Sequence, residues 1–150
     1  MYLNCKTYYS LRYGTYSTDK LVKEAADKGV RSLALTNINN TSDEWEFVKL
    51  CRDNGIKPVI GTEIRNEDEL LYILIAANNN GLHWIHDFLS FHLINKHPFP
   101  PCDNVESFFG NIKDGYAIFP YNTKPLAGLK ENEFIGIRNR ELNALVTLIF

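Results

Sequence analysis

The sequence predicts an α/β fold, and two observations carry this prediction. Hydrophobic periodicity changes repeatedly along the chain, from the two-residue repeat of strands to the repeat of about 3.6 residues typical of helices. Short strands that alternate with helices of about ten residues imply right-handed crossovers and parallel neighbouring strands. The 150 residues are the size of one domain, and a hydrophobic fraction of 45% is sufficient for a buried core.

Alternating side chains predict the first strand, and an apolar stripe that ends at a glycine predicts the first helix. Residues 1–7 alternate in a way that is typical of a strand, and a loop rich in tyrosine and hydroxyl groups follows over 8–17. Either Thr18 or Ser17 can cap a helix with one apolar stripe that runs to about Lys28, and Gly29 ends it. The apolar run at 31–36 predicts a short buried strand.

A capping motif predicts the second helix. Residues 41–44 read Thr-Ser-Asp-Glu, a capping box in which Thr41 and Glu44 would bind each other's free backbone amides. The helix is predicted to run to Asn54, where Asn-Gly is a stop signal. Its predicted inward side chains are Trp45, Val48 and either Leu50 or Cys51.

The next elements complete the order β-α-β-α-β-β-α, and after them the sequence signals become weaker. Strands are predicted at 56–64 and 70–77, and 78–81 breaks the chain before a helix at 82–93. After a proline-rich connector, the predicted elements are strands at 115–120 and 134–137 and a helix at 140–148.

The composition excludes several classes of protein. Sixteen Lys and Arg residues against 18 Asp and Glu residues give a net charge of −2, whereas nucleic-acid-binding modules carry a basic excess. No apolar stretch approaches the roughly 18 residues of a membrane span, and no signal peptide is visible. The three cysteines form no Cys-x-x-Cys pair, so we expect reduced thiols in a cytoplasmic protein that does not contact membrane.

The sequence finishes on the apolar run Leu-Val-Thr-Leu-Ile-Phe. Natural C-termini seldom end on such a segment. We therefore expect residues 1–150 to form one truncated domain of a longer polypeptide.

Polar side chains occur where the first three predicted strands end. Asn4 and Lys6 share one face of the first strand, Asn37 follows the second strand, and Glu63 lies at the end of the third. In α/β folds, ligands bind at this carboxyl edge of the sheet. The sequence therefore predicts a site there.

Several segments, taken in order, form a recognisable series. They are 3–14 (Leu-x-x-x-Thr-x-Tyr-Ser-Leu-x-x-Gly), 34–39 (Ala-Leu-Thr-x-x-Asn), 55–63 (Gly-Ile-Lys-Pro-Val-Ile-Gly-x-Glu), 74–81 and 130–138. This series resembles the PHP (polymerase and histidinol phosphatase) domain, and most of all the version at the N-terminus of bacterial C-family DNA polymerases, the alpha subunits of DNA polymerase III. The resemblance is strongest over residues 1–93, and segment 130–138 is similar to versions from the Bacteroidetes group. The resemblance implies a distorted (β/α)7 barrel, and we expect an incomplete one because a full barrel needs more residues.

The metal motifs of this family are altered here. The family's His-x-His motif corresponds to Asn4 and Lys6, and its Thr-Asp-His motif ends here on Asn37 and Ile38, whereas Glu63 keeps the third motif, Gly-x-Glu. In metal-binding members these positions hold ions that activate water for phosphoester hydrolysis. Asn is a poor ligand, Lys repels a cation and Ile has no lone pair. We therefore expect no metal, no cofactor and no catalytic residues in this degenerate pocket.

A carboxylate in such a pocket needs another counter-charge, because burial of an unpaired charge is costly. We predict an internal ion pair between Lys6 and Glu63, with Asn37 as a bridge. In the alternative interpretation, Lys6 extends into solvent and Glu63 is exposed.

Two other groups of residues are candidates for binding. His83 and His86 are spaced as zinc ligands can be, but they lack a second ligand cluster, so a surface or interface role is favoured. The loop tyrosines beside Arg12 could stack on single-stranded bases. We favour a role in covering the barrel mouth and contacting another domain.

The resemblance implies a non-catalytic N-terminal domain of a DNA polymerase III alpha subunit. Such domains pack on the rest of the polymerase chain and can dock a proofreading exonuclease, and they meet DNA only through the parent polymerase. The parent transfers nucleotides onto a primer, but nothing here resembles its catalytic carboxylates. The alternative is a free-standing PHP phosphoesterase with a rebuilt metal site.

Overall fold

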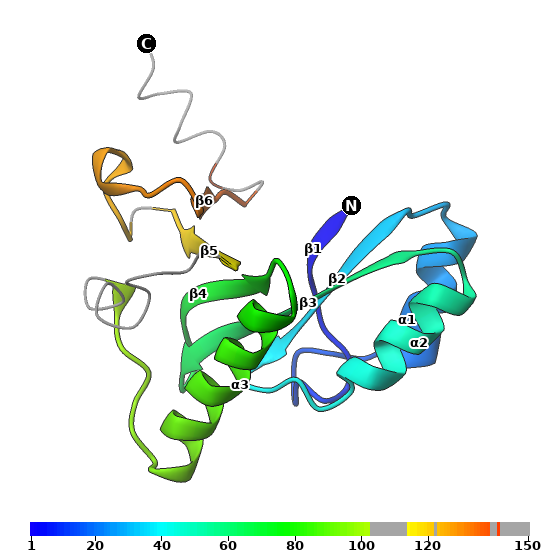
Figure 1. Ribbon diagram of the computed structural model, residues 1–150, viewed down its shortest axis with the longest axis horizontal. Coiled ribbons are helices and arrows are strands. Elements are labelled where there is room, and N and C mark those ends of the chain that lie inside the picture. Colours follow the sequence, from blue (N-terminus) through cyan, green and yellow to red (C-terminus); the bar gives the residue numbers. More distant parts are fainter. Residues whose placement is uncertain (103–113, 122, 139–140, 142–150) are drawn as a thin grey trace.

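The computed structural model describes residues 1–102, 114–121, 123–138 and 141. Six strands form one sheet in the order β1-β2-β3-β4-β5-β6, and the sheet curls into a half-barrel (Figure 1). The strands are β1 (Tyr2–Cys5), β2 (Ser32–Ile38), β3 (Lys57–Asn66), β4 (Glu69–Ala76), β5 (Gly115–Pro120) and β6 (Glu133–Gly136). The helices are α1 (Thr18–Asp27), α2 (Glu44–Asp53), α3 (Asn79–Ile94) and the short 3-10 helix η2 (Leu126–Gly128).

The strand directions are mixed. β1, β2 and β3 run parallel, and the helices α1 and α2 make the crossovers between them. β4 is antiparallel to both β3 and β5, whereas β6 is parallel to β5. The predicted order of the first seven elements is confirmed, as is the α/β class with an incomplete barrel. The sheet is mixed, so the expectation of parallel neighbouring strands holds for only some of the strand pairs.

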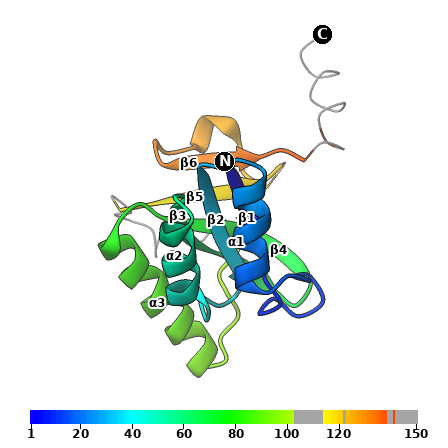
Figure 2. The same cartoon turned by 90° about the vertical axis from the view of Figure 1, so that its right-hand side faces the viewer.

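The helices cover one face of the sheet (Figure 2). Successive side chains of a strand point to opposite faces, so they alternate between the helix side and the other face. On the helix side, Leu33, Leu35 and Ile60 pack against side chains of α1 and α2, and Cys51 is fully buried there as expected. On the opposite face, which we call the concave face, Ala34 contacts the smaller apolar cluster that includes Ile73. Far fewer buried apolar side chains pack together on the concave face than on the helix side.

The capping box predicted for α2 is wrong. The contact between Thr41 and Glu44 is a backbone hydrogen bond of 3.1 Å, and the N-cap residue Asp43 makes no side-chain bond to the helix amides. The predicted inward face of α2 was right in part: Cys51 is fully buried and Val48 packs against the same core. Trp45, however, is 83% exposed, and Phe47 is buried instead. Apolar residues occur on two faces of this helix, so the pattern alone did not fix which face turns inward.

Helix α3 begins earlier than predicted. The side chain of Asn78 accepts hydrogen bonds from the amides of Asn80 and Gly81, so this segment starts the helix instead of breaking the chain. No helix in the described ranges is long and apolar enough to cross a membrane. The helix predicted at 140–148 lies outside the described residues, apart from Glu141.

Candidate functional site

Glu63 is the centre of a charged cluster at the carboxyl end of β3. Its side chain is 1% exposed. In the sheet it pairs with Ile38 of β2 and Ile73 of β4, so its side chain belongs to the concave face. A carboxylate buried to this degree requires partners that offset the loss of water.

Two cations hold the carboxylate of Glu63. The ammonium Nζ of Lys6 lies 2.8 Å from Oε2, and the guanidinium Nε of Arg65 lies 2.6 Å from Oε1. The two basic side chains are only 14% and 11% exposed, so bulk water screens these pairs weakly. The structure therefore places Lys6 and Glu63 side by side, and it adds Arg65 to the pair.

The pKa of Glu63 lies below its ordinary value. Burial by itself would raise this pKa, but the hydrogen bond and the charge of Lys6, with the hydrogen bonds from Asn4 and Arg65, lower it by more. Glu63 is consequently ionised at neutral pH.

Asn4 links the members of the cluster. Its amide Nδ2 donates to Glu63 Oε2 at 2.9 Å, and its Oδ1 accepts from Lys6 Nζ at 2.7 Å. The same Oδ1 accepts from Thr36 Oγ1 at 2.7 Å, which ties β1 to β2. The bridging role expected of Asn37 thus falls to Asn4.

Asn37 lies on the other side of the sheet, so its expected bridging role is wrong. Its amide donates to Asp43 Oδ1 at 2.7 Å and to Thr7 Oγ1 at 3.0 Å. Asn37 pairs with Thr62 in the register of β2 and β3, whereas Ile38 pairs with Glu63. Residues 33–37 are buried on both faces, so polarity along β2 did not reveal which side chains point to the concave face.

A second polar cluster, which we call the Asp43 network, was not predicted from the sequence. Asp43 Oδ2 accepts from Thr7 Oγ1 at 2.8 Å and from Thr18 Oγ1 at 2.6 Å, while Oδ1 accepts from Asn37. All four residues are at most 3% exposed. The network joins the ends of β1 and β2 to the starts of α1 and α2. Its members are far apart in sequence and form no recognisable spacing.

Arg65 was also missed, although one signal was present. It follows Glu63 by two residues, the spacing that places side chains on the same face of a strand, but the strand predicted from the sequence stops at residue 64, whereas β3 continues to Asn66. Its guanidinium lies 4.3 Å from the centre of the Tyr13 ring and donates to the Tyr13 hydroxyl at 2.9 Å. One tyrosine of the 8–17 loop thus lies over the charged cluster.

The histidines of α3 do not form a metal site. Nε2 of His86 lies 2.8 Å from Oε2 of Glu44 and so connects α3 with α2, whereas His83 lies 3.5 Å from Asp87 on its own helix. Among the residues that the structure describes, no three His, Cys, Asp or Glu side chains are grouped closely enough to hold a metal ion.

The architecture places the chain among α/β barrel domains that carry polar side chains at the carboxyl ends of their strands. The PHP domain family matches residues 3–118, and the chain belongs to this family.

DNA polymerase subunits are among the relatives of this chain. The chain is 40% identical over 62 residues to DNA polymerase III subunit alpha of Chlamydia trachomatis, a match that covers 41% of this chain and 5% of that protein. It is 31% identical over 84 residues to the same subunit of Streptococcus pyogenes, covering 54% of this chain and 8% of that protein. The chain thus spans a small part of the length of these relatives, to which it is distantly related.

Solved structures share the fold. An amidohydrolase from Chromobacterium violaceum, with bound sulfate and no metal, aligns with a TM-score of 0.54 and 10% identity, covering 97% of this chain and 71% of that chain. A protein assigned as a metal-dependent phosphoesterase from Bifidobacterium adolescentis aligns with a TM-score of 0.51 and 13% identity, covering 97% and 73%. At these identities the likeness concerns the fold alone.

Proposed function

We propose that this chain is a non-catalytic PHP domain of the DNA polymerase III alpha type and acts as a structural or docking domain. The observation that supports the proposal is the state of Glu63, whose carboxylate is held by Lys6 and Arg65. A negative charge already neutralised in this way is a poor starting point for binding a metal ion.

The other side chains at this edge do not suit a metal cluster either. Lys6 and Arg65 would repel an approaching cation, and Ile38 offers no lone pair. Asn4 uses its amide oxygen for Lys6 and Thr36, so this atom is also engaged. Because the donor set does not fit the family's metals, we assign no catalytic step to these residues.

The proposed partners are the remaining polymerase chain and, through it, a proofreading exonuclease and DNA. The names of the relatives support the first of these. The 8–17 loop, whose Tyr13 contacts Arg65, offers large exposed side chains, among them Tyr9 at 40% and Leu11 at 83% exposure. The loop that carries them is held in place, since Ser10 Oγ donates to Asn37 Oδ1 at 2.8 Å. Ordered aromatic side chains are well suited to protein interfaces.

Co-purification with the cognate polymerase body, expressed without its own PHP domain, tests the docking role. We expect stable binding by the full chain and weaker binding by a Tyr9→Ala/Leu11→Ala variant. Ile94→Ala is the matched control, because Ile94 is 78% exposed on α3 and lies outside this loop. Failure of the full chain to bind would contradict the proposal. Metal-dependent hydrolysis of a phosphoester would instead support the free-standing phosphoesterase.

A further inference from the structure

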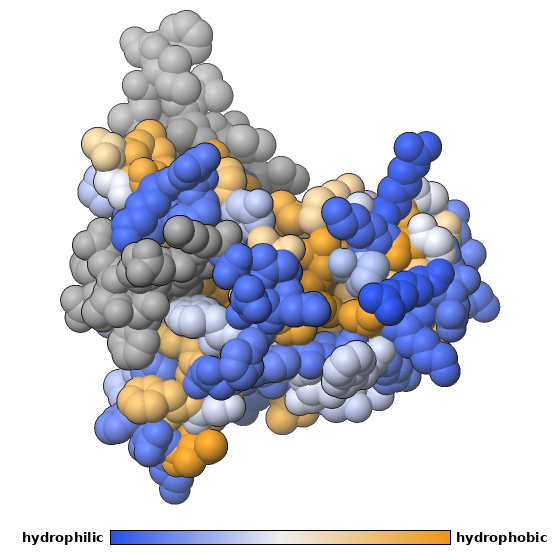
Figure 3. Space-filling view, viewed as in Figure 1, coloured by the Kyte–Doolittle hydropathy of each residue, from blue (hydrophilic) through white to orange (hydrophobic). Residues whose placement is uncertain are grey.

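The concave face of the half-barrel opens into a large groove that the charged cluster does not explain. Its volume is about 1270 Å³, larger than the pockets of about 300–1,000 Å³ that hold small molecules. Figure 3 shows hydrophobic side chains gathered in the hollow at the middle of this side of the molecule. Trp45, Tyr116 and Phe134 line the groove and are 83%, 44% and 49% exposed. Large exposed apolar side chains around a hollow of this size favour contact with another macromolecule over a small ligand.

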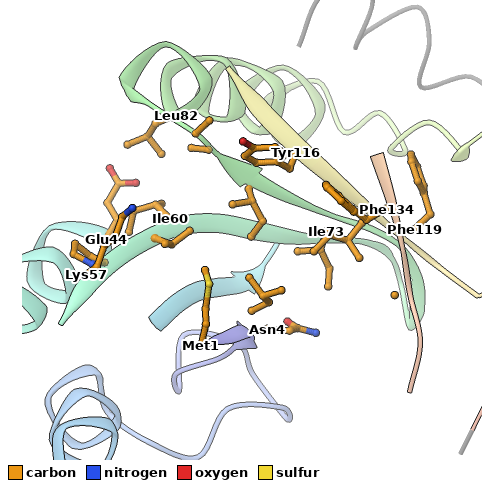
Figure 4. Close-up of a pocket in the computed structure, with 18 of the residues that line it drawn as sticks. Met1, Asn4, Glu44, Lys57, Ile60, Ile73, Leu82, Tyr116, Phe119 and Phe134 are labelled. Atoms are coloured by element: carbon orange, nitrogen blue, oxygen red, sulfur yellow. The ribbon is translucent and has the colours of Figure 1, made fainter. Parts of the chain in front are cut away.

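The floor of the groove is formed by side chains of strands that are paired on both edges. β3 and β4 contribute Ile60 and Ile73, and each of these strands lies between two neighbours in the sheet. In Figure 4, Ile73 lies between Asn4 on one side of the opening and Tyr116 and Phe134 on the other. Since the backbone of these strands is already engaged in the sheet, a polypeptide that lies on the floor has to satisfy its own amides and carbonyls. An α-helix does so, whereas an extended segment does not.

The charged residues of the groove leave basic groups available. Among the residues that the structure describes, the charged ones that line the groove are Glu44, Arg52, Lys57, Arg138 and Glu141. Both acidic side chains are engaged, since Glu44 Oε2 lies 2.8 Å from Nε2 of His86 and Glu141 Oε2 accepts from the amide of Arg138 at 2.7 Å. Arg52 and Lys57 are exposed and take part in none of the ion pairs found within the described ranges. A positive excess therefore remains at the groove, although the chain as a whole carries a net charge of −2.

We propose that the groove binds an amphipathic helix of a partner protein, with the apolar face of that helix on the floor and its acidic side chains beside Arg52 and Lys57. Binding of a helix in a hydrophobic groove is a recurrent mode of recognition, in which buried apolar area gives affinity and charges at the rim give selectivity. A single-stranded nucleic acid fits the floor less well, because its bases need aromatic platforms, whereas Ile60, Ile73 and Leu82 are aliphatic. This inference does not rest on the proposed function, which concerns the 8–17 loop.

Binding of a synthetic peptide to the full chain tests the proposal. The probe is a fluorescently labelled peptide of about 14 residues, which spans about 21 Å as a helix, with leucine on one helix face and glutamate on the other. A matched peptide carries lysine at every glutamate position. In fluorescence anisotropy we expect the glutamate peptide to bind and the lysine peptide to bind about tenfold more weakly. No binding of the glutamate peptide, or equal binding of the two peptides, would overturn the proposal.

Reversal of the charge at the groove tests the role of the two basic residues. An Arg52→Glu/Lys57→Glu variant should bind the glutamate peptide about tenfold more weakly than the unaltered chain does, and the lysine peptide more tightly. Lys23→Glu/Lys49→Glu is the matched control, because it changes the net charge equally at exposed positions of α1 and α2 that do not line the groove. The control should keep the preference for the glutamate peptide. The same change of preference in both variants would contradict recognition at the groove.

An apolar residue of the groove gives a further comparison. Phe134→Asp should abolish binding of the glutamate peptide, whereas Leu126→Asp should leave it unchanged, because Leu126 is 75% exposed and does not line the groove. The Tyr9→Ala/Leu11→Ala variant should also bind the peptide as the unaltered chain does, so the groove and the proposed docking loop are tested separately.

Two results would assign the groove to another occupant and overturn the proposal. One is binding of a single-stranded oligonucleotide that competes with the peptide and is lost in Phe134→Asp. The other is a dimer of the full chain, measured by light scattering, that Phe134→Asp dissociates into monomers.

Discussion

At the scale of single residues, the defining feature is the buried carboxylate of Glu63 between two cations. Lys6 approaches one oxygen atom and Arg65 the other, at 2.8 Å and 2.6 Å. Since Glu63 is buried, removal of one partner leaves charge that water cannot reach. Loss of one partner is therefore costly, whereas the net attraction among the three charges adds less to the stability of the intact fold.

Lys6→Met tests this contribution. We expect a loss of about 1–3 kcal/mol in the free energy of unfolding at pH 7, because Arg65 still pairs with Glu63. The folded-state pKa of Glu63 is lowered, so its contribution is present above the pKa of an ordinary glutamate and is lost as the pH falls through the folded value. The effect of Lys6→Met should accordingly shrink in acid. Urea unfolding at pH 7 and at pH 3 measures both.

Lys28→Met is the control for this experiment. Lys28 also forms an ion pair, with Glu24 at 3.2 Å, but its side chain is 65% exposed. Its removal should not change stability measurably. Equal effects of the two variants would show that burial of the Glu63 cluster is unimportant.

At the scale of elements, buried polar contacts and one close backbone approach fix how strands and helices join. The Asp43 network connects β1, α1, β2 and α2 through hydroxyl and amide donors. At Gly61, a Cβ atom would come within 2.2 Å of the carbonyl oxygen of Leu74 on the neighbouring strand. The glycine of the Gly-x-Glu motif is thus required by the pairing of β3 with β4.

Asp43→Ala should lower the free energy of unfolding by about 2–4 kcal/mol, because buried donors of Thr7, Thr18 and Asn37 lose their acceptor. Thr41→Ala should have little effect, since Thr41 caps the helix only through its backbone carbonyl. Urea unfolding compares the two variants. A larger effect of Thr41→Ala would restore the capping box and contradict the observed network.

Gly61→Ala should prevent folding or destabilise the chain strongly, because a backbone carbonyl cannot move away from the added methyl group without separating β3 from β4. Gly128→Ala is the matched control, as nothing lies within 4 Å of its added Cβ. Thermal unfolding followed by circular dichroism gives the comparison. A Gly61→Ala variant as stable as the control would mean that the two strands are less tightly paired than described.

At the scale of the whole molecule, local periodicity predicted much of the fold, but long-range contacts decided the site. The order of the first seven elements follows from alternation, helix stripes and glycine stops. The burial of Phe47 and the orientation of Asn37 could not be predicted, because α2 carries apolar residues on two faces and β2 is buried on both faces. Arg65 could have been identified from its spacing to Glu63, whereas the Asp43 network joins residues with no local pattern.

The concave face of the half-barrel carries two adjoining regions of different character, and Asn4 belongs to both. Charged and polar side chains gather at the carboxyl ends of the strands, while apolar side chains line the groove of the concave face. We assign no chemistry to the charged region.

Hydrolysis of p-nitrophenyl phosphate by the full chain, with Mn²⁺ or Zn²⁺ added, measures whether this region is catalytic. We expect the rate to equal that of the metal ion in buffer, for the unaltered chain and for Glu63→Gln alike. Metal-dependent turnover by the unaltered chain that Glu63→Gln abolishes would contradict this expectation.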